Sequence, residues 1–581
     1  MNNLIKRHYP ALLLSSIIFL HGCTGSSQTD TKEPDQAETP ILMATKSPRP
    51  EDKRLSVPMT SAPTEAVLSM QQKGVAHRAL KEQRSKMPQN APSGSAIYSD
   101  MIEQEMPPLY PQFQRESYDA LTENPFIATM NDPLSTFSID VDTASYANVR
   151  RWLTDGSLPP VGAVRIEEMI NYFSYHYPEP ENGPLGITTE LGPCPWQPAN
   201  KLVRIGLKAK DLDPGNIPPS NLVFLIDVSG SMNDDNKLPL LKQSMLMLMD
   251  KLTVDDRVSI VVYAGSDRVI LPPTRGDQKE EIRKAITNLT SGGSTHASSG
   301  ILTAYNLARQ NFIKNGNNRI ILASDGDFNV GVTSRGELER LVAQERESGI
   351  YLTVLGFGMG NYHDDTMEIL ADKGNGNYSY IDSLLETKKV LIKERAGTLF
   401  TLARDVKLQI EFNPARVGGY RLIGYENRAL ADEDFNNDKK DAGEIGAGHT
   451  VTALYELLPV GSNMVPKVDP LKYQRIAQPA DNSAEVLSVK LRYKPLSSNK
   501  SLLLNQTVID NSKILASTSN DFRFASTVAG FGMLLRQSEH ASQLSYPQLI
   551  AMAQKSRGTD EEGYRAEFIR LLEMSELLQD K

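Results

Sequence analysis

Residues 223–232 read VFLIDVSGSM, in which an unbroken apolar run leads into Asp227, Ser229 and Ser231. A short apolar run without alternation is typical of a strand buried on both faces, as in a parallel sheet covered by helices. Three similar runs follow, each separated from the next by segments of helical period. This alternation from about residue 220 to 395 predicts a doubly wound, mostly parallel α/β sheet. The later runs are RVSIVVYAG, NRIILAS and YLTVLGFG.

Oxygen-bearing side chains follow the strands of this predicted sheet. Asp227, Ser229 and Ser231 follow the first run, Asp325 follows NRIILAS, and Thr295 lies in a GGST loop before a helix. Ligands bind at the carboxyl ends of strands in such sheets. Carboxylate and hydroxyl oxygens select a hard cation, Mg²⁺, Mn²⁺ or Ca²⁺. If the hydroxyls bind directly and the carboxylates act partly through water, the ion stays electrophilic and can accept a carboxylate from another protein.

The ordered set of D-x-S-x-S, a Thr in GGST and an Asp in ASDGD resembles the metal-ion-dependent adhesion site of von Willebrand factor type A (VWA) domains. The resemblance implies a Rossmann-like fold, a bound Mg²⁺ and a protein partner that offers an acidic residue to the ion. The flanks, which include TFSIDVDTASYANVRRWL and YRLIGYENRAL, are similar to the bacterial YfbK-like lipoproteins. That second resemblance covers nearly everything beyond the N-terminal segment.

Residues 136–145, TFSIDVDTAS, look at first like a second copy of the metal motif. Asp142 stands where the first Ser should be, Thr143 and Ser145 are out of register, and no GGxT or SDG loop follows before residue 220. A side-chain oxygen of one of these residues is expected to cap the helix SYANVRRWL by accepting a backbone N–H. We expect a helix cap here rather than a metal site.

Residues 432–444, DEDFNNDKKDAGE, begin like a calcium-binding loop but do not fit its full pattern. Asp432 and Asp434 fit its first and third positions, but Asn437 replaces the required Gly and Gly443 replaces the bidentate Glu at position twelve. The pattern predicts a solvated acidic turn.

The N-terminus has the composition of a secretory signal. Lys6 and Arg7 precede the apolar run ALLLSSIIFL, and Leu-His-Gly-Cys23 ends it. Leu-x-Gly-Cys resembles the bacterial lipoprotein signal, in which cleavage precedes a Cys whose thiol carries diacylglycerol. The alternative is a plain secretory signal with a chance Cys. Because Thr24 rather than Asp follows Cys23, the resemblance implies a lipid-anchored protein of the bacterial cell envelope, at the outer membrane and facing the periplasm.

Composition narrows the class of protein further. The 581 residues carry a formal net charge of -9, which argues against nucleic-acid binding. If Cys23 is acylated, Cys194 has no disulfide partner and is expected to be a buried, inert thiol.

Strands before and after the α/β unit are expected to belong to one sandwich that this unit interrupts. The predicted segments are 1–22 signal peptide, 23–121 lipidated Cys and disordered tether, 122–218 flanking α+β domain, 219–397 VWA domain, 398–520 β-rich domain and 521–581 helical segment.

Three functions remain compatible with the sequence. The first is a non-enzymatic binding module that holds a partner through the metal ion. The second is a metal-dependent hydrolase, although no residue is nominated as a general base and neither HExxH nor G-x-S-x-G occurs. The third is an envelope scaffold whose metal site is vestigial.

Overall fold

The computed structural model describes residues 116–579, apart from 214, 216, 294–296, 327–334, 361 and 468–482. All elements below belong to the unit formed by Met106–Lys581. Cys23, most of the predicted tether and Thr295 lie outside the described residues.

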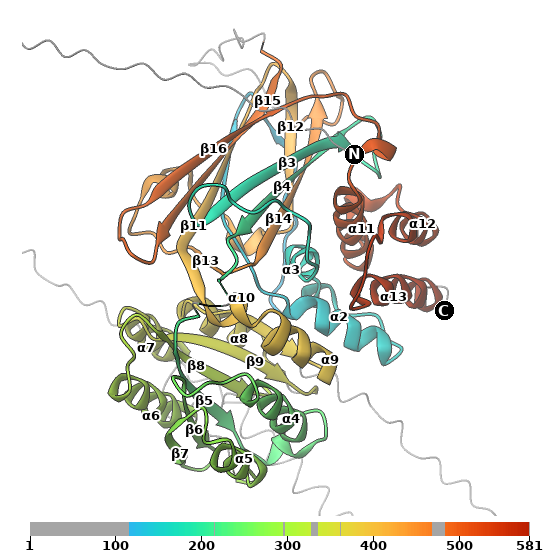
Figure 1. Ribbon diagram of the computed structural model, residues 1–581. Helices are drawn as coiled ribbons and strands as arrows, with labels where there is room; N and C mark the ends of the chain where they lie inside the picture. Colours follow the sequence, from blue (N-terminus) through green and yellow to red (C-terminus); the bar gives the residue numbers. More distant parts are fainter. Residues whose placement is uncertain are drawn as a thin grey trace, which may run out of the picture. The chain divides into compact units, whose positions relative to one another are not determined.

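A six-stranded sheet forms the centre of the α/β part, with the strand order β10-β9-β8-β5-β6-β7 (Figure 1). Neighbouring strands are parallel, except that β7 runs antiparallel to β6 at one edge. The doubly wound, mostly parallel sheet expected from the sequence is therefore confirmed. Its strands are β5 (Ser220–Asp227), β6 (Arg257–Tyr263), β7 (Asp267–Arg275), β8 (Asn317–Ser324), β9 (Tyr351–Phe357) and β10 (Tyr378–Ile381).

Helices cover both faces of this sheet and build a separate apolar core on each. Residues of α4 (Leu238–Met249) and α5 (Lys279–Thr287) pack on one face. Residues of α6 (Ala297–Gln310), α7 (Arg335–Arg346) and α8 (Asp364–Lys373) pack on the other. The central strands are therefore buried on both sides, which explains their unbroken apolar runs.

The chain leaves the α/β part through a broken helix. After β10 it forms α9 (Leu384–Thr387), a π-helical turn (Lys388–Lys393) and α10 (Arg395–Leu399). Residues 383–405, SLLETKKVLIKERAGTLFTLARD, have a helical period in the sequence, but the last five of them are not helical. Residues from Thr401 onward are strand, because the first part of β11 (Thr401–Phe412) pairs with a strand on each side, and these satisfy its backbone groups.

Two further sheets pack face to face and share one core. One has the order β1-β12-β14-β4-β3, and the other has β13-β11-β15-β16 with β2 also paired to β11. Strand β4 precedes the α/β part and pairs with β14, which follows it, so the expected interrupted sandwich is confirmed. The first sheet comprises β1 (Ile127–Ala128), β3 (Leu185–Pro193), β4 (Lys201–Ala209), β12 (Val417–Ile423) and β14 (Thr450–Pro459). The second adds β2 (Leu134–Ser138), β13 (Gly443–Gly446), β15 (Glu485–Pro495) and β16 (Leu502–Ile509) to β11.

The C-terminal helices pack with the two helices that lie between β2 and β3, so segments near both ends of the described chain share one core. Cys194 is buried in this core, where burial raises its pKa, in agreement with the expected inert thiol. Among the residues that the structure describes, none of the helices combines the length and apolar character needed to cross a bilayer. The helices of this core are α2 (Ala144–Thr154), α3 (Ile166–Asn171), α11 (Asn520–Leu535), α12 (Tyr546–Ser556) and α13 (Tyr564–Gln579). Short 3₁₀ turns are η2 (Val161–Ala163), η3 (Gly230–Asn233), η5 (Glu426–Arg428), η6 (Asp432–Asn436), η7 (Leu515–Ser517) and η8 (Glu539–Ala541).

Candidate metal centre

Asp227 ends β5 and is fully buried between two strand ends. Its Oδ1 accepts a 2.8 Å hydrogen bond from the backbone N–H of Ser229. Its Oδ2 accepts one of 3.3 Å from the hydroxyl of Ser324, the last residue of the neighbouring strand β8. The carboxylate is therefore fixed at the carboxyl edge of the sheet, where ligands bind in this class of fold.

The two serines of the motif lie beside this carboxylate. The hydroxyl oxygens of Ser229 and Ser231 are 3.0 Å apart at the start of turn η3. The turn is tied to the GGST loop, because Gly230 donates its N–H to the carbonyl of Gly293 at 3.1 Å. The N–H of Gly292 donates to the carbonyl of Val228 at 2.7 Å. The start of the loop that carries Thr295 is thus held against the serine turn.

Asp325 directly follows β8 and is 5 % exposed. Its Oδ2 lies 3.1 Å from the ammonium of Lys237, which also donates to the backbone carbonyl of Ser231 at 3.0 Å. The next residue, Gly326, has a φ of +83°, and a Cβ there would lie 2.7 Å from the backbone nitrogen of His363. The Gly of the SDG sequence is therefore required by the tight turn that follows Asp325.

The two carboxylates at this edge, those of Asp227 and Asp325, favour the binding of a cation. Burial, together with the nearby charge of Asp325, raises the pKa of Asp227 to about 6, although the hydrogen bonds from Ser229 and Ser324 act in the opposite direction. Ser231 is exposed, so the group of oxygens opens to solvent on one side. An all-oxygen donor set with two carboxylates and one open face fits a hard divalent cation.

The structure brings together four of the five predicted ligands, namely Asp227, Ser229, Ser231 and Asp325, and Thr295 lies outside the described residues. Sequence reasoning missed Lys237. Its position before a helix carried no signal of proximity to Asp325, which lies 88 residues further along the chain.

The second motif, TFSIDVDTAS, does not form the predicted helix cap. Thr143 holds the N-cap position of α2 without a side-chain hydrogen bond. The N–H of Ser145 donates instead to Glu168 Oε2 at 2.8 Å, and Asp142 accepts from Tyr378. The cap prediction is wrong because a glutamate on α3, 23 residues away, supplies the acceptor.

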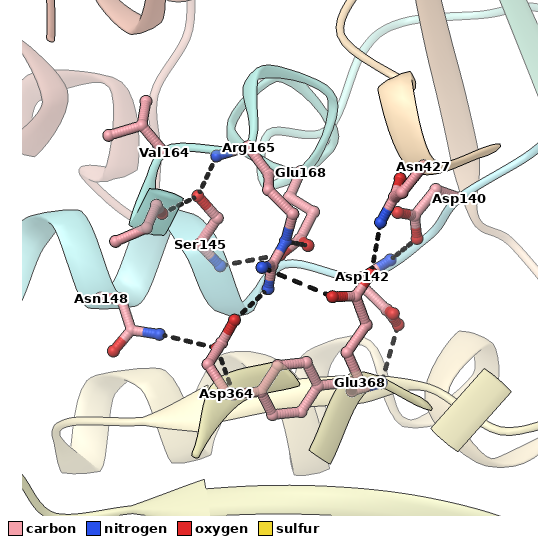
Figure 2. A network of polar contacts seen from close by, with 12 residues as sticks. Asp140, Asp142, Ser145, Asn148, Val164, Arg165, Glu168, Asp364, Glu368 and Asn427 are labelled. Atoms are coloured by element: carbon pink, nitrogen blue, oxygen red, sulfur yellow. Dashed lines mark hydrogen bonds and ion pairs between the residues drawn. The ribbon is translucent and has the colours of Figure 1, made fainter. Parts of the chain in front are cut away.

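Asp142 belongs to a buried group of charges between the N-terminal flank and α8 (Figure 2). Oxygen atoms of Asp140, Glu168 and Glu368 all lie within 4.8 Å of one another, so these carboxylates could hold a cation. Two guanidinium groups already pair with the carboxylates of this group. The pairs are Arg165 with Asp364 at 2.7 Å and with Glu168, and Arg428 with Asp140 and with Glu368, each at 3.2 Å.

These ion pairs make the charged group a structural junction, because they join the flank to α8 of the α/β part. Burial raises the pKa of Glu168 and of Asp142, and neighbouring carboxylates raise both further.

Residues 432–436 form the 3₁₀ turn η6, in which Asp432 accepts from Thr136 at 2.6 Å and Asp434 pairs with Lys440 at 2.9 Å. That arrangement agrees with the acidic turn expected there.

A parallel sheet with helices on both faces and this ordered oxygen set at its carboxyl edge defines a VWA-domain protein. Residues 221–392 match the family model of the von Willebrand factor type A domain, and 112–204 match one described as von Willebrand factor. Residues 397–578 match the C-terminal region of uncharacterized protein YfbK. The YfbK protein of Escherichia coli strain K12 is 44% identical over 474 residues, which cover 80% of this chain and 81% of that protein. The chain belongs to the YfbK family.

More distant relatives match smaller parts of the chain or share less sequence with it. The bovine inter-alpha-trypsin inhibitor heavy chain H3 is 26% identical over 284 residues, which cover 45% of this chain and 31% of that protein. A solved von Willebrand factor type A structure from Catenulispora acidiphila is 13% identical with a TM-score of 0.39, and the match covers 68% of this chain and 91% of that one.

Proposed function

We propose that this protein holds a partner protein through a divalent cation, Mg²⁺ in the first place, bound at the carboxyl edge of its VWA domain. VWA domains often mediate protein–protein interaction and commonly bind a divalent metal. The ligands are Asp227, Ser229, Ser231, Thr295 and Asp325, and the partner supplies a carboxylate to the open face of the ion. The protein acts by binding and not as an enzyme.

One observation carries this proposal. The hydroxyl oxygens of Ser229 and Ser231 lie 3.0 Å apart, and both serines closely follow the buried carboxylate of Asp227, which is hydrogen-bonded to the backbone of Ser229. With the two neutral hydroxyl oxygens bound directly and the carboxylates of Asp227 and Asp325 acting partly through water, the ion stays electrophilic at its open face. Such an ion attracts an additional carboxylate, and burial of the site on its protein side strengthens that attraction.

The place of action follows from the sequence of the N-terminus. We propose that Cys23 carries a lipid and anchors the protein in the bacterial cell envelope, at the outer membrane and facing the periplasm. The motivation is the Leu-x-Gly-Cys sequence at the end of an apolar run. The partner is then another envelope protein with an exposed acidic residue.

Equilibrium dialysis of the purified full-length protein against Mn²⁺, with Mg²⁺ as competitor, tests the metal step. The parent should bind one ion, and Asp227→Ala should bind none. Asp235→Ala is the matched control, because Asp235 is an exposed acid in the loop that follows Ser231. Equal binding by the parent and Asp227→Ala would remove the proposal.

Affinity capture from envelope extracts tests the partner step. Proteins retained by the parent in Mg²⁺ should be released by EDTA and should be absent with Asp227→Ala. A scaffold with a vestigial site would keep its partners in EDTA. Metal-dependent turnover of a substrate by the purified protein would favour the hydrolase instead.

A further inference from the structure

Lys237 places its ammonium on Asp325, a predicted ligand of the metal. It precedes α4 and is 6 % exposed. Its Nζ lies 3.1 Å from Asp325 Oδ2 and 3.7 Å from Asp234 Oδ2, and the Asp234 side chain is largely exposed. The ammonium therefore has one buried acidic partner and a second one at the surface.

The aliphatic part of Lys237 runs through a gap that the fold keeps open. Gly358 follows β9 with a φ of +78°, and a Cβ at this position would collide with Cγ, Cδ and Cε of Lys237. The hydroxyl of Tyr380 donates to the carbonyl of Gly358 and holds that turn in place. Lys237 is thus guided to the metal edge by packing and is not a surface lysine that meets Asp325 by chance.

We infer that Lys237 is a built-in counter-cation that competes with the divalent ion for Asp325 and turns toward Asp234 when the ion binds. This inference rests on the proposed metal site. The reason is electrostatic: an ammonium neutralises Asp325 beside the buried Asp227, whereas an ammonium and a divalent ion around the same carboxylate repel each other.

The competition regulates the adhesion site. While Lys237 holds Asp325, the ion binds weakly, because it must displace a charge that already has partners. A carboxylate from the partner adds the negative charge that favours the divalent ion over the ammonium. Metal and partner therefore bind cooperatively, and neither fills the site well without the other.

Mn²⁺ dialysis of full-length variants tests the inference. Lys237→Met keeps the aliphatic stem without the charge and should bind Mn²⁺ about tenfold more tightly than the parent. Asp234→Asn removes the alternative partner of the ammonium and should bind Mn²⁺ several-fold more weakly. Lys242→Met is the control, since Lys242 lies on α4 close to Lys237 in sequence but donates to the carbonyls of Thr287 and Leu289.

A melting curve in EDTA supplies a second measurement. Lys237→Met should melt at a lower temperature than the parent without metal, and saturating Mg²⁺ should raise its melting temperature by more than it raises that of the parent. If Lys237→Met does not fold, Asp234→Asn at the surface still decides the question.

The outcomes separate this inference from the function on which it rests. Unchanged or weaker Mn²⁺ binding by Lys237→Met, with normal binding by the parent, overturns the counter-cation and leaves the metal site standing. Unchanged binding by Asp234→Asn overturns the exchange of partners. If neither the parent nor Lys237→Met binds Mn²⁺, both the inference and the proposed function are wrong.

Discussion

The carboxylate of Asp142 accepts a 2.7 Å hydrogen bond from the backbone N–H of Tyr378, the first residue of β10, which lies 236 residues further along the chain. The backbone N–H of Thr143 returns a bond of 3.4 Å to the carbonyl of Tyr378. Strand β10 is the last strand of the central sheet on that side. The flank thus pairs with an edge strand of the VWA domain and covers backbone groups that would otherwise be exposed.

Asp142→Ala should therefore cost more than the roughly 1 kcal/mol of a lost helix cap. We expect a loss of about 2–3 kcal/mol, because the buried N–H of Tyr378 is left without an acceptor. Asp142→Asn keeps an acceptor oxygen and should lose less. Calorimetric unfolding measures the effect, with Asp155→Ala as an exposed control. Mn²⁺ binding should be unchanged, and a variant that loses the metal would contradict the separation of the two motifs.

Glu167 should make the stability depend on pH. It is fully buried on α3, and neither side-chain oxygen has a hydrogen-bond partner on another described residue. Burial and the nearby Glu426 raise the pKa of Glu167 from 4.5 to about 7. Between pH 4.5 and 7 the folded protein therefore binds more protons than the unfolded chain. The contribution of protonated Glu167 to the stability is complete below pH 4.5 and is lost as the pH rises through 7.

Glu167→Gln should remove this pH dependence. The variant should be more stable than the parent at pH 8, by on the order of 3 kcal/mol, and close to it at pH 4.5. The difference between the two unfolding free energies at each pH is the measurement, because it cancels the other titrating groups. A constant difference from pH 4.5 to 8 would show that Glu167 does not titrate in this range.

Arg150 is expected to hold three elements together. Its guanidinium donates to Asp382 at 2.7 Å, Glu386 at 2.6 Å and Glu567 at 2.9 Å, and so joins α2 to the α9 region and to α13. Arg150→Met should cost about 3–5 kcal/mol, because buried carboxylates lose their counter-charge. Arg150→Lys keeps the charge without the planar fork, so its stability should lie between those of the parent and Arg150→Met.

Hydrogen exchange locates the effect of the Arg150 variants. Amides of α13 should exchange faster in Arg150→Met than in the parent, while those of the central strands β5 and β8 should not. Arg340→Met, at an exposed position on α7, is the matched control. Uniformly faster exchange would show a global loss of stability in place of a released helix.

Cys23→Ser should move the protein out of the membrane fraction. The prediction rests on the Leu-x-Gly-Cys sequence alone, because Cys23 lies outside the described residues. Cys194→Ala is the control, since Cys194 is buried and should not affect fractionation. A Cys23→Ser protein that sediments with membranes as fully as the parent would remove the anchor.

The central sheet could be predicted from the sequence where burial dictates composition. The runs that form β5, β6, β8 and β9 are mainly apolar because helices cover both faces. Strand β7 was missed, because DRVILPPTR carries two prolines and is half exposed at an antiparallel edge. Strand β10 was missed because its four residues are too short to show a period.

The candidate site could be predicted only where its residues follow a local motif. Asp227, Ser229 and Ser231 are fixed by their spacing after one strand, and Asp325 by its turn. The contacts of Asp325 with Lys237 and of Asp142 with Tyr378 join positions far apart in the chain, and no periodicity announces them. They depend on how helices and flanks pack, which one sequence does not reveal.

The insertion of the VWA domain between β4 and β11 has a mechanical consequence. Both connections to the sandwich meet the sheet at the amino ends of its strands, where Arg319 of β8 donates to the carbonyl of Leu399 and to the hydroxyl of Thr401. The metal edge is the opposite one, at Asp227. A partner that pulls on the ion would therefore stretch the parallel strands along their own length. Neighbouring strands would have to slide past one another with many hydrogen bonds breaking together, so the domain should resist tension far better than it resists peeling from an edge.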